Sequence, residues 1–214
     1  MKKKVLYIYG YGSSPESNTA TWLKENLPNS EVYSFKYDQR HPDESIPYLC
    51  QLVHDLDIDI IIGSSLGGWY AMHVASICSL PSLLINPVSD ITLKSTIELV
   101  SDNDEHLVNT LVKYSEEHPL FATKEHWTGY RWDDSEDGYY SVLVWSDNDG
   151  VIGRKKILPT EFHRNFLTKY IIPNGRHQLT SEEKEKYLIP AYKNLIYEII
   201  PKVDNFYKNT LIIP

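Results

Sequence analysis

Residues 63–67 read G-S-S-L-G and fit the pattern G-x-S-x-G in one frame, with Ser65 at the centre. The apolar run 58–62 leads into this segment and Gly68 follows it. Such a context predicts a sharp strand-to-helix turn, which strains the serine backbone and points Oγ out of the sheet. Ser65 is therefore a candidate nucleophile, and the Leu66 N–H at the helix start is a candidate oxyanion donor. A glycine-rich turn without catalysis is the alternative.

A serine at its ordinary pKa is a poor nucleophile, so a base and an orienting acid must exist elsewhere in the chain. The order that suits a G-x-S-x-G serine is Ser, then acid, then His. The turn after the apolar run 141–145 contains Asp147 and Asp149. We select Asp149 as the acid and keep Asp147 as the alternative. Both could also be simple turn formers, because Asp, Asn and Gly favour turns.

The base should follow the next strand, and the apolar run 169–172 is followed by a Pro-Asn-Gly turn and then His177. His177 is the histidine that follows a strand end in the last quarter of the chain, and we select it as the base. His163, between the last two expected strands, is the alternative. The remaining six histidines precede the acid turn: His41, His54, His73, His106, His118 and His126.

A second oxyanion donor is expected in the loop after the first strand. Residues 10–15 read G-Y-G-S-S-P, and the Tyr11 N–H is the best candidate donor. A phosphate-binding glycine loop is the alternative interpretation. That alternative is disfavoured, because the segment lacks the third glycine of the dinucleotide fingerprint and the lysine of a P-loop.

These residues need a sheet that brings their loops to one edge, and six short apolar runs bounded by turn residues predict one. The expected strands are residues 5–9, 31–35, 58–62, 82–85, 141–145 and 169–172. The expected helices are residues 14–27, with Ser14 as N-cap and Pro15 in the first turn, 43–55, 65–78 and 182–199. Alternating strands and helices of this kind favour an α/β fold with a mostly parallel sheet.

The alternation fails between residues 88 and 140, which we interpret as a cap-like insertion within a single domain. Residues 92–100 and 104–115 look helical. An aromatic and charged stretch follows, which could line an acyl pocket or simply pack on the sheet: Phe121, Trp127, Tyr130, Trp132, Tyr139 and Tyr140. The tail 201–214 has apolar residues but no clear assignment.

The composition bounds the class of protein. The chain has 214 residues, 42% of them hydrophobic and 23% charged, which suits one soluble folded domain. A net charge of −8 disfavours nucleic acid and anionic membrane surfaces as partners. Two cysteines, Cys50 and Cys78, build neither a disulfide framework nor a four-ligand zinc site. With no membrane span and an apolar run after the N-terminal lysines too short for a secretory signal, we expect a cytoplasmic protein.

Three segments carry a resemblance to a known family: residues 7–17 (Y-I-Y-G-Y-G-S-S-P-E-S), residues 62–71 (I-G-S-S-L-G-G-W-Y-A) and residues 84–87 (L-I-N-P). The chain resembles the α/β-hydrolase superfamily and, within it, the small YqiA-like esterase family. The resemblance covers residues 4–90 and 141–185. That family's first loop reads His-Gly-Phe, and Tyr9 stands here in place of the histidine.

The resemblance implies a serine esterase of α/β-hydrolase fold with Ser65, Asp149 and His177 at the matching positions, and no metal or organic cofactor. We expect small carboxylic esters as substrates. Two other readings stay open: a thioesterase, amidase or carbon–carbon hydrolase with the same triad, and a hydrolase-fold interaction module whose site is vestigial. The oligomeric state is not predicted.

Overall fold

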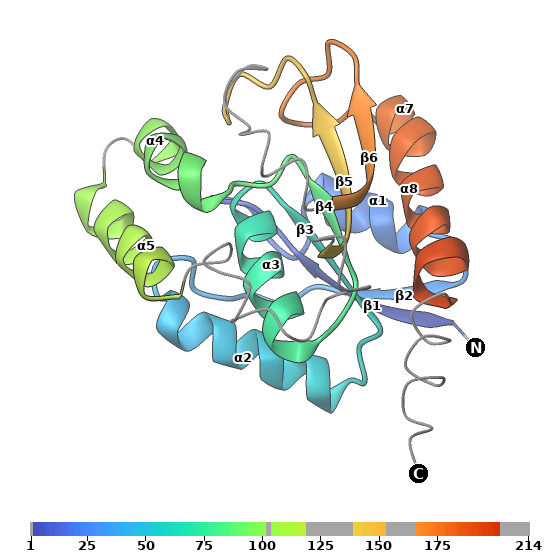
Figure 1. The fold of residues 1–214 in the computed structure, drawn as a ribbon, viewed down its shortest axis with the longest axis horizontal. Helices are drawn as coiled ribbons and strands as arrows, with labels where there is room; N and C mark the ends of the chain where they lie inside the picture. The colour runs from blue at the N-terminus through green and yellow to red at the C-terminus, as the bar shows by residue number, and fades with distance from the viewer. Residues whose placement is uncertain (1, 102–103, 119–138, 153–165, 202–214) are drawn as a thin grey trace, which may run out of the picture.

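A computed structural model describes residues 2–101, 104–118, 139–152 and 166–201. Within these residues six strands form one sheet in the order β2-β1-β3-β4-β5-β6, and all neighbouring strands are parallel (Figure 1). The strands are β1 (Lys3–Ile8), β2 (Ser30–Tyr33), β3 (Ile60–Ser64), β4 (Ser82–Ile85), β5 (Tyr139–Ser146) and β6 (Phe166–Ile172). The predicted sheet is therefore confirmed, with strand ends displaced by up to three residues.

The register of the central strands explains why the loops of the expected site meet. Ile8 of β1 lies beside Gly63 of β3, and Gly63 lies beside Leu84 of β4. Ile85 in turn lies beside Val144 of β5. Because these strands are parallel and nearly level, the turns that follow them all leave from the same edge of the sheet.

Helices cover both faces of the sheet, which is why its central strands are apolar along their whole length. On one face lie α1 (Asn18–Asn26) and a continuous C-terminal helical run of α7 (Ser181–Glu183), residues 184–188, α8 (Ile189–Asn194) and residues 195–199 (Figure 1). On the other face lie α2 (Pro42–Asp55) and α3 (Leu66–Cys78). No helix in the described part of the chain is both long enough and apolar enough to cross a bilayer.

The expected start of the first helix is wrong by three to four residues. Ser17, not Ser14, is the N-cap of α1, and its side chain accepts a hydrogen bond from the Ala20 N–H. Ser14 instead forms a local turn: its carbonyl accepts from the Ser17 N–H and its hydroxyl accepts from the Glu16 N–H. A serine before a proline serves a turn as readily as a helix cap, so the sequence pattern alone misplaced this boundary.

Two helices lie between β4 and β5 in the chain, as expected for residues 88–140. They are α4 (Asp90–Val100) and α5 (Glu105–Glu117), and the Asp104 carboxylate caps α5 by accepting from the Leu107 N–H. The insertion aromatics from Phe121 to Trp132 and the tail 202–214 lie outside the described residues. Cys50 and Cys78 are free thiols and only half-buried.

Candidate active site

The turn between β3 and α3 holds Ser65 in a backbone conformation that side-chain-bearing residues rarely adopt. Ser65 has φ 53° and ψ −127°, a strained arrangement that costs about 1–3 kcal/mol and persists only where the surroundings enforce it. Three hydrogen bonds enforce it here. The Ser65 N–H donates to the Ile85 carbonyl (3.0 Å), and the Ser65 carbonyl accepts from the N–H groups of Gly68 and Val88 (2.9 Å each).

Close packing explains why the residues around this turn are glycines. A Cβ atom on Gly63 would lie 2.4 Å from the Ala71 Cβ, and one on Gly67 would lie 2.2 Å from the Ile8 carbonyl oxygen. A Cβ on Gly68 would lie 2.6 Å from the Pro87 Cβ. Real Cβ atoms do not approach their neighbours so closely, so α3 can start directly against β1 only because these positions lack side chains.

The loops after β5 and β6 bring the predicted base and acid to Ser65. His177 Nε2 lies 2.9 Å from Ser65 Oγ, and His177 Nδ1 lies 2.7 Å from Asp149 Oδ2. A carboxylate can only accept, so this contact favours the tautomer with its proton on Nδ1. Nε2 is then free to accept the serine proton. The three side chains thus form one hydrogen-bonded chain from a buried carboxylate to the hydroxyl.

Asp149 and Asp147 take different places, although only one residue separates them. Asp149 is fully buried, and its Oδ1 accepts from the N–H groups of Val151 (2.8 Å) and Ile152 (3.0 Å) while Oδ2 faces His177. Asp147 Oδ1 accepts from the Asn174 N–H (2.6 Å) in the turn after β6. The structure therefore brings Asp149 to the histidine, and Asp147 ties two turns together. The alternative base, His163, lies outside the described residues.

The neighbouring hydroxyl of Ser64 is held away from the histidine. The side chains of Ser64 and Tyr7 are hydrogen-bonded, with 2.7 Å between Ser64 Oγ and the Tyr7 hydroxyl. Burial raises the pKa of Tyr7, so this phenol stays protonated at neutral pH. Of the two adjacent serines, only Ser65 contacts His177.

The loop after β1 lies directly against the serine. A Cβ on Gly10 would be 2.9 Å from the Ser65 Cβ, so the loop backbone passes next to the nucleophile, and Tyr11 lines the same cleft. Leu66 is the first residue of α3, so its N–H has no acceptor within the helix. These positions fit the two expected oxyanion donors.

Gln39 holds this loop in place, and sequence reasoning missed it. Its side-chain amide donates to the Gly10 carbonyl (2.7 Å), and its side-chain oxygen accepts from the Gly12 N–H (3.1 Å). Its own carbonyl accepts from the buried Tyr70 hydroxyl (3.1 Å). Gln39 therefore bridges the residues on either side of Tyr11. No motif marks it, because the contact joins segments about 30 residues apart through the fold alone.

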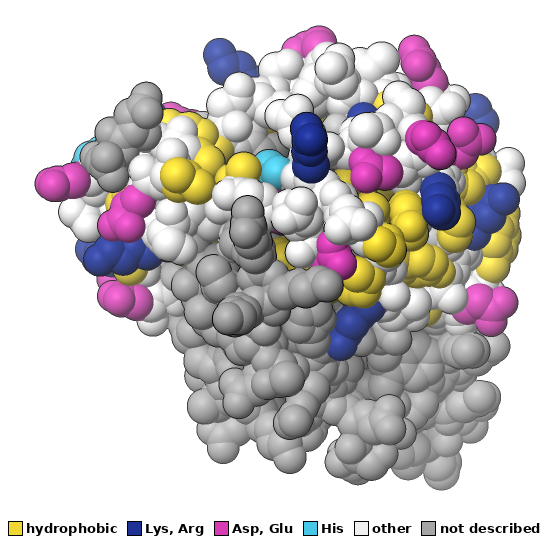
Figure 2. Space-filling model, turned by 90° about the horizontal axis from the view of Figure 1, so that it is seen from above, with side chains coloured by type: hydrophobic (Ala, Val, Ile, Leu, Met, Phe, Trp, Pro, Cys, Tyr) yellow, Lys and Arg dark blue, Asp and Glu magenta, His cyan; other side chains and the backbone are white. Residues whose placement is uncertain are grey.

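A cleft of about 830 Å³ opens beside Ser65 and His177 and extends between α1 and the start of the C-terminal helical run. Much of its wall carries hydroxyl groups, from Ser13, Ser17, Thr19, Thr21, Thr180 and Ser181. Figure 2 views the molecule from the side toward which β5 and β6 point, and there hydrophobic side chains gather among charged ones toward the right. The described residues contain no cluster of three His, Cys, Asp or Glu side chains that could hold a metal ion.

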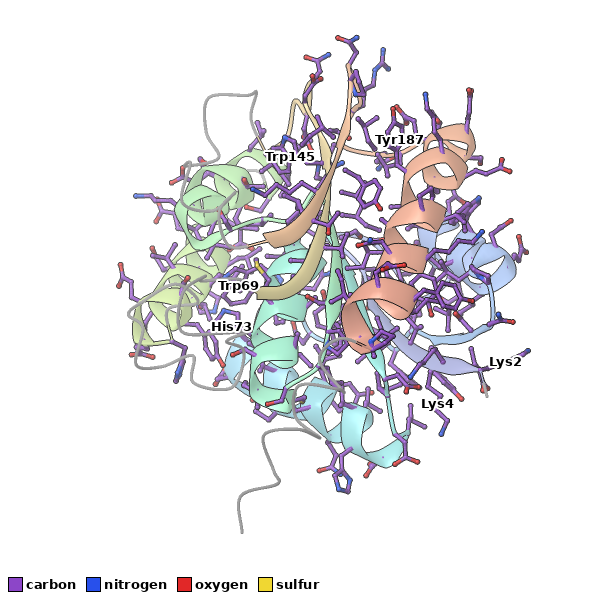
Figure 3. The ribbon with its side chains drawn as sticks, turned by 45° about the vertical axis from the view of Figure 1, so that its right-hand side comes forward. Lys2, Lys4, Trp69, His73, Trp145 and Tyr187 are labelled. Carbon is purple, nitrogen blue, oxygen red and sulfur yellow. The ribbon has the colours of Figure 1, made fainter. Side chains whose placement is uncertain are left out.

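His73 belongs to the packing behind the site and not to the cleft. Figure 3 labels His73 and Trp69, both on α3. The centre of the His73 ring lies 4.4 Å from the centre of the Trp69 ring and 5.4 Å from the centre of the Tyr114 ring on α5. It is 4% exposed, and burial lowers its pKa to about 3, with a smaller contribution from His118. His73 is thus a neutral core residue near pH 7.

The parallel sheet, the strained serine turn and the loops after its strands define the α/β-hydrolase fold, and comparison with solved structures agrees. The chain is similar to Est1E from Butyrivibrio proteoclasticus, solved with ferulic acid, at a TM-score of 0.64 and 14% identity over 93% of this chain and 90% of that one. It is similar to the thioesterase RedJ of Streptomyces coelicolor at a TM-score of 0.53 and 10% identity over 90% and 85% of the two chains. At these identities the likeness shows the fold alone.

The chain belongs to the UPF0227 family, whose model is described as an uncharacterised protein family and matches residues 4–180. The curated relatives include a UPF0227 protein of Citrobacter koseri (27% identical over 89 residues) and YcfP of Escherichia coli (26% over 89 residues). Each match covers 39% of this chain and 49% of the relative, so the chain spans about half the length of the curated relatives it matches. The expected membership of a YqiA-like family with the α/β-hydrolase fold is confirmed.

Proposed function

We propose that this protein is a serine hydrolase that cleaves small carboxylic esters through an acyl-enzyme on Ser65. His177 serves as base and acid, Asp149 orients it, and the N–H groups of Tyr11 and Leu66 bind the oxyanion. The observation that carries the proposal is the hydrogen-bonded chain from the buried Asp149 through His177 to a serine held at positive φ. Strain, burial and hydrogen bonding converge on one hydroxyl, and structural serines have no need of this arrangement.

The geometry supports a two-step acyl transfer. His177 Nε2 accepts the Ser65 proton as Oγ attacks the ester carbonyl carbon, and the carbonyl electrons move onto the oxygen held by the two N–H groups. As the tetrahedral intermediate collapses, the bond to the alcohol oxygen breaks and His177 gives that oxygen its proton. Water then loses a proton to His177 and attacks the acyl carbon, which releases the acid and returns the proton to Ser65.

We place the substrate ester in the cleft beside Ser65 and treat residues 88–140 as a cap-like insertion that borders it. Val100 at the end of α4 lines the cleft, which gives this insertion a direct contact with the site. The cleft suits small polar esters, because the Ser and Thr hydroxyl groups in its lining can hydrogen-bond to polar groups of a substrate.

The decisive experiment is active-site labelling with a fluorophosphonate, read by intact mass and peptide mapping, with p-nitrophenyl acetate turnover alongside. We expect one adduct, on Ser65, in the wild-type protein and in Ser64→Ala, and none in Ser65→Ala. Turnover should fall by about 10⁴-fold or more in Ser65→Ala. Folded wild-type protein that takes up no label and hydrolyses no ester would overturn the proposal in favour of a vestigial, interaction-only site. Labelling with a preference for thioesters or amides would keep the nucleophile and change the substrate class.

A further inference from the structure

The wall of the cleft contains a buried lysine, and a buried ammonium group is stabilised by an anionic partner. Lys184 is 6% exposed and lines the cleft together with Ser65 and His177. In the described part of the chain no carboxylate lies within ion-pair distance of its Nζ. Lysines are almost never buried to this extent without a counter-charge, because removing an ammonium group from water is costly.

The Lys184 ammonium group lies near an aromatic ring. Its Nζ lies 6.0 Å from the centre of the Trp22 ring, at the limit of a cation–π contact. Burial lowers the pKa of Lys184, as expected when an ammonium group is removed from water. The ammonium group therefore gains from any anion that enters the cleft.

The first turn of α1 adds a second positive element to the same wall. Asn18 and Thr19 line the cleft at the N-terminus of this nine-residue helix, whose first turn contains no acidic residue. Helix N-termini carry partial positive charge and free N–H groups, and they favour anions. Glu25, one to two turns further along α1, also borders the cleft, so the favourable region is confined to the part of the wall between the α1 start and Lys184.

We propose that the ester substrate carries a second, anionic group, a carboxylate or a phosphate, which binds to Lys184 beside the first turn of α1. This inference rests on the proposed function. It further assigns the anion to the alcohol half of the ester. Residues 177–181 form a continuous stretch of the cleft wall that leads from His177 to Lys184, and His177 is the group that would protonate the departing alcohol oxygen.

The test compares esters that share an acetyl group and differ in the charge of the alcohol. The probes are 4-acetoxybenzoate, 4-acetoxyphenyl phosphate and the neutral methyl 4-acetoxybenzoate. The variants are Lys184→Met, Lys184→Arg, which retains the charge, and Lys186→Met, which removes an exposed lysine from the same helix as a matched control.

We expect the wild type to favour at least one anionic ester over the neutral one by about 10- to 100-fold in kcat/KM, the size of a charge-assisted hydrogen bond. Lys184→Met should abolish this preference and leave kcat/KM for the neutral ester within about threefold. Lys184→Arg should retain most of the preference, and Lys186→Met all of it. An unchanged preference in Lys184→Met, or none in the wild type, would overturn the inference.

A binding measurement separates failure of this inference from failure of the proposed function. In Ser65→Ala, calorimetric titration with 4-hydroxybenzoate and phenyl phosphate should detect binding that Ser65→Ala/Lys184→Met loses, and the stronger ligand identifies the anion. Binding lost with Lys184 in a protein that hydrolyses no ester would retain the anion site and reject the esterase. Ester turnover with equal binding in both variants would retain the esterase and reject the anion site.

Discussion

The two walls of the cleft are built on different principles. The inner wall consists of the Ser65 turn, the loop 10–12 and the Asp149–His177 pair, and its polar groups are tied to one another by short hydrogen bonds. The outer wall includes residues of α1 and of the start of the C-terminal helical run that line the cleft: Ser17, Asn18, Thr19, Thr21, Thr180, Ser181 and Lys184. On the inner wall a residue is determined by its neighbours in the protein. On the outer wall, we infer that the identity of Lys184 is determined by the ligand that it binds.

This difference has a physical consequence for substitution. Where polar atoms are hydrogen-bonded within the protein and a glycine such as Gly67 lies against backbone, even a conservative change can leave a buried group unsatisfied or make two atoms overlap. Lys184 has no ion pair among the described residues, so a change there removes chiefly what its charge would contribute to a ligand. Changes on the inner wall should therefore alter stability and rate, and a change at Lys184 should alter chiefly substrate preference.

The largest expected effect separates the two aspartates of the inner wall. Asp149→Asn should lower kcat for p-nitrophenyl acetate by about 10⁴-fold, because an amide can donate to Nδ1 and so favour the wrong histidine tautomer. Asp147→Asn should change kcat by less than about tenfold, because an asparagine oxygen can still accept from the Asn174 N–H. Steady-state kinetics of the two variants checks this. Equal losses would mean that the assignment of the acid to Asp149 is wrong.

The next effect concerns the packing of the serine turn. Gly67→Ala should lower the free energy of unfolding by about 2–3 kcal/mol, because the added Cβ would overlap the Ile8 carbonyl of β1 and outweigh the helix propensity of alanine. Gly150→Ala is the matched control, since no atom lies within 4 Å of its added Cβ, and it should change stability by no more than about 0.5 kcal/mol. Urea unfolding measures both. A neutral Gly67→Ala would contradict the idea that close packing imposes the turn.

A smaller effect should follow from releasing the loop after β1. Gln39→Met removes the side-chain hydrogen bonds to Gly10 and Gly12 and should lower kcat by about 10- to 100-fold with little change in KM, because the Tyr11 N–H would no longer be held at the proposed oxyanion position. Gln51→Met is the control, because Gln51 is exposed on α2 and its side chain donates a hydrogen bond to Asp55 rather than to the loop. A loss that appears in KM alone would instead make Gln39 a substrate-binding residue.

The smallest effect tests the packing layer behind the inner wall through pH. The pKa of His73 is about 3 in the folded protein, against 6.5 for an ordinary histidine, so between these values only the unfolded chain binds the proton. The contribution of His73 to stability should therefore fall as the pH falls, by about 1.4 kcal/mol for each pH unit between about 6 and 4. His73→Phe should reduce this slope in urea unfolding between pH 6 and pH 4. The exposed His54→Phe should leave it unchanged.

Local patterns in the chain were sufficient to predict the sheet, most of its helices and a short set of candidate residues. Apolar runs of four to five residues between turn formers indicated buried parallel strands, and the confirmed sheet needs little more than that periodicity. Because parallel strands present their carboxyl ends at one edge, the chain order of Ser65, the aspartate turn and His177 was enough to expect them together.

Tertiary structure alone decided the rest. The choice between Asp149 and Asp147 depends on which carboxylate the turn after β5 buries, and two aspartates in one turn have the same local pattern. The start of α1 depended on whether Ser14 or Ser17 capped it, and both are serines. Gln39 and Lys184 carry no motif, since their contacts, and the anion-binding role proposed for Lys184, involve segments far away in the chain. Local structure can be predicted from residues that are close in the sequence. Contacts between distant segments depend on how the strands align in the folded protein.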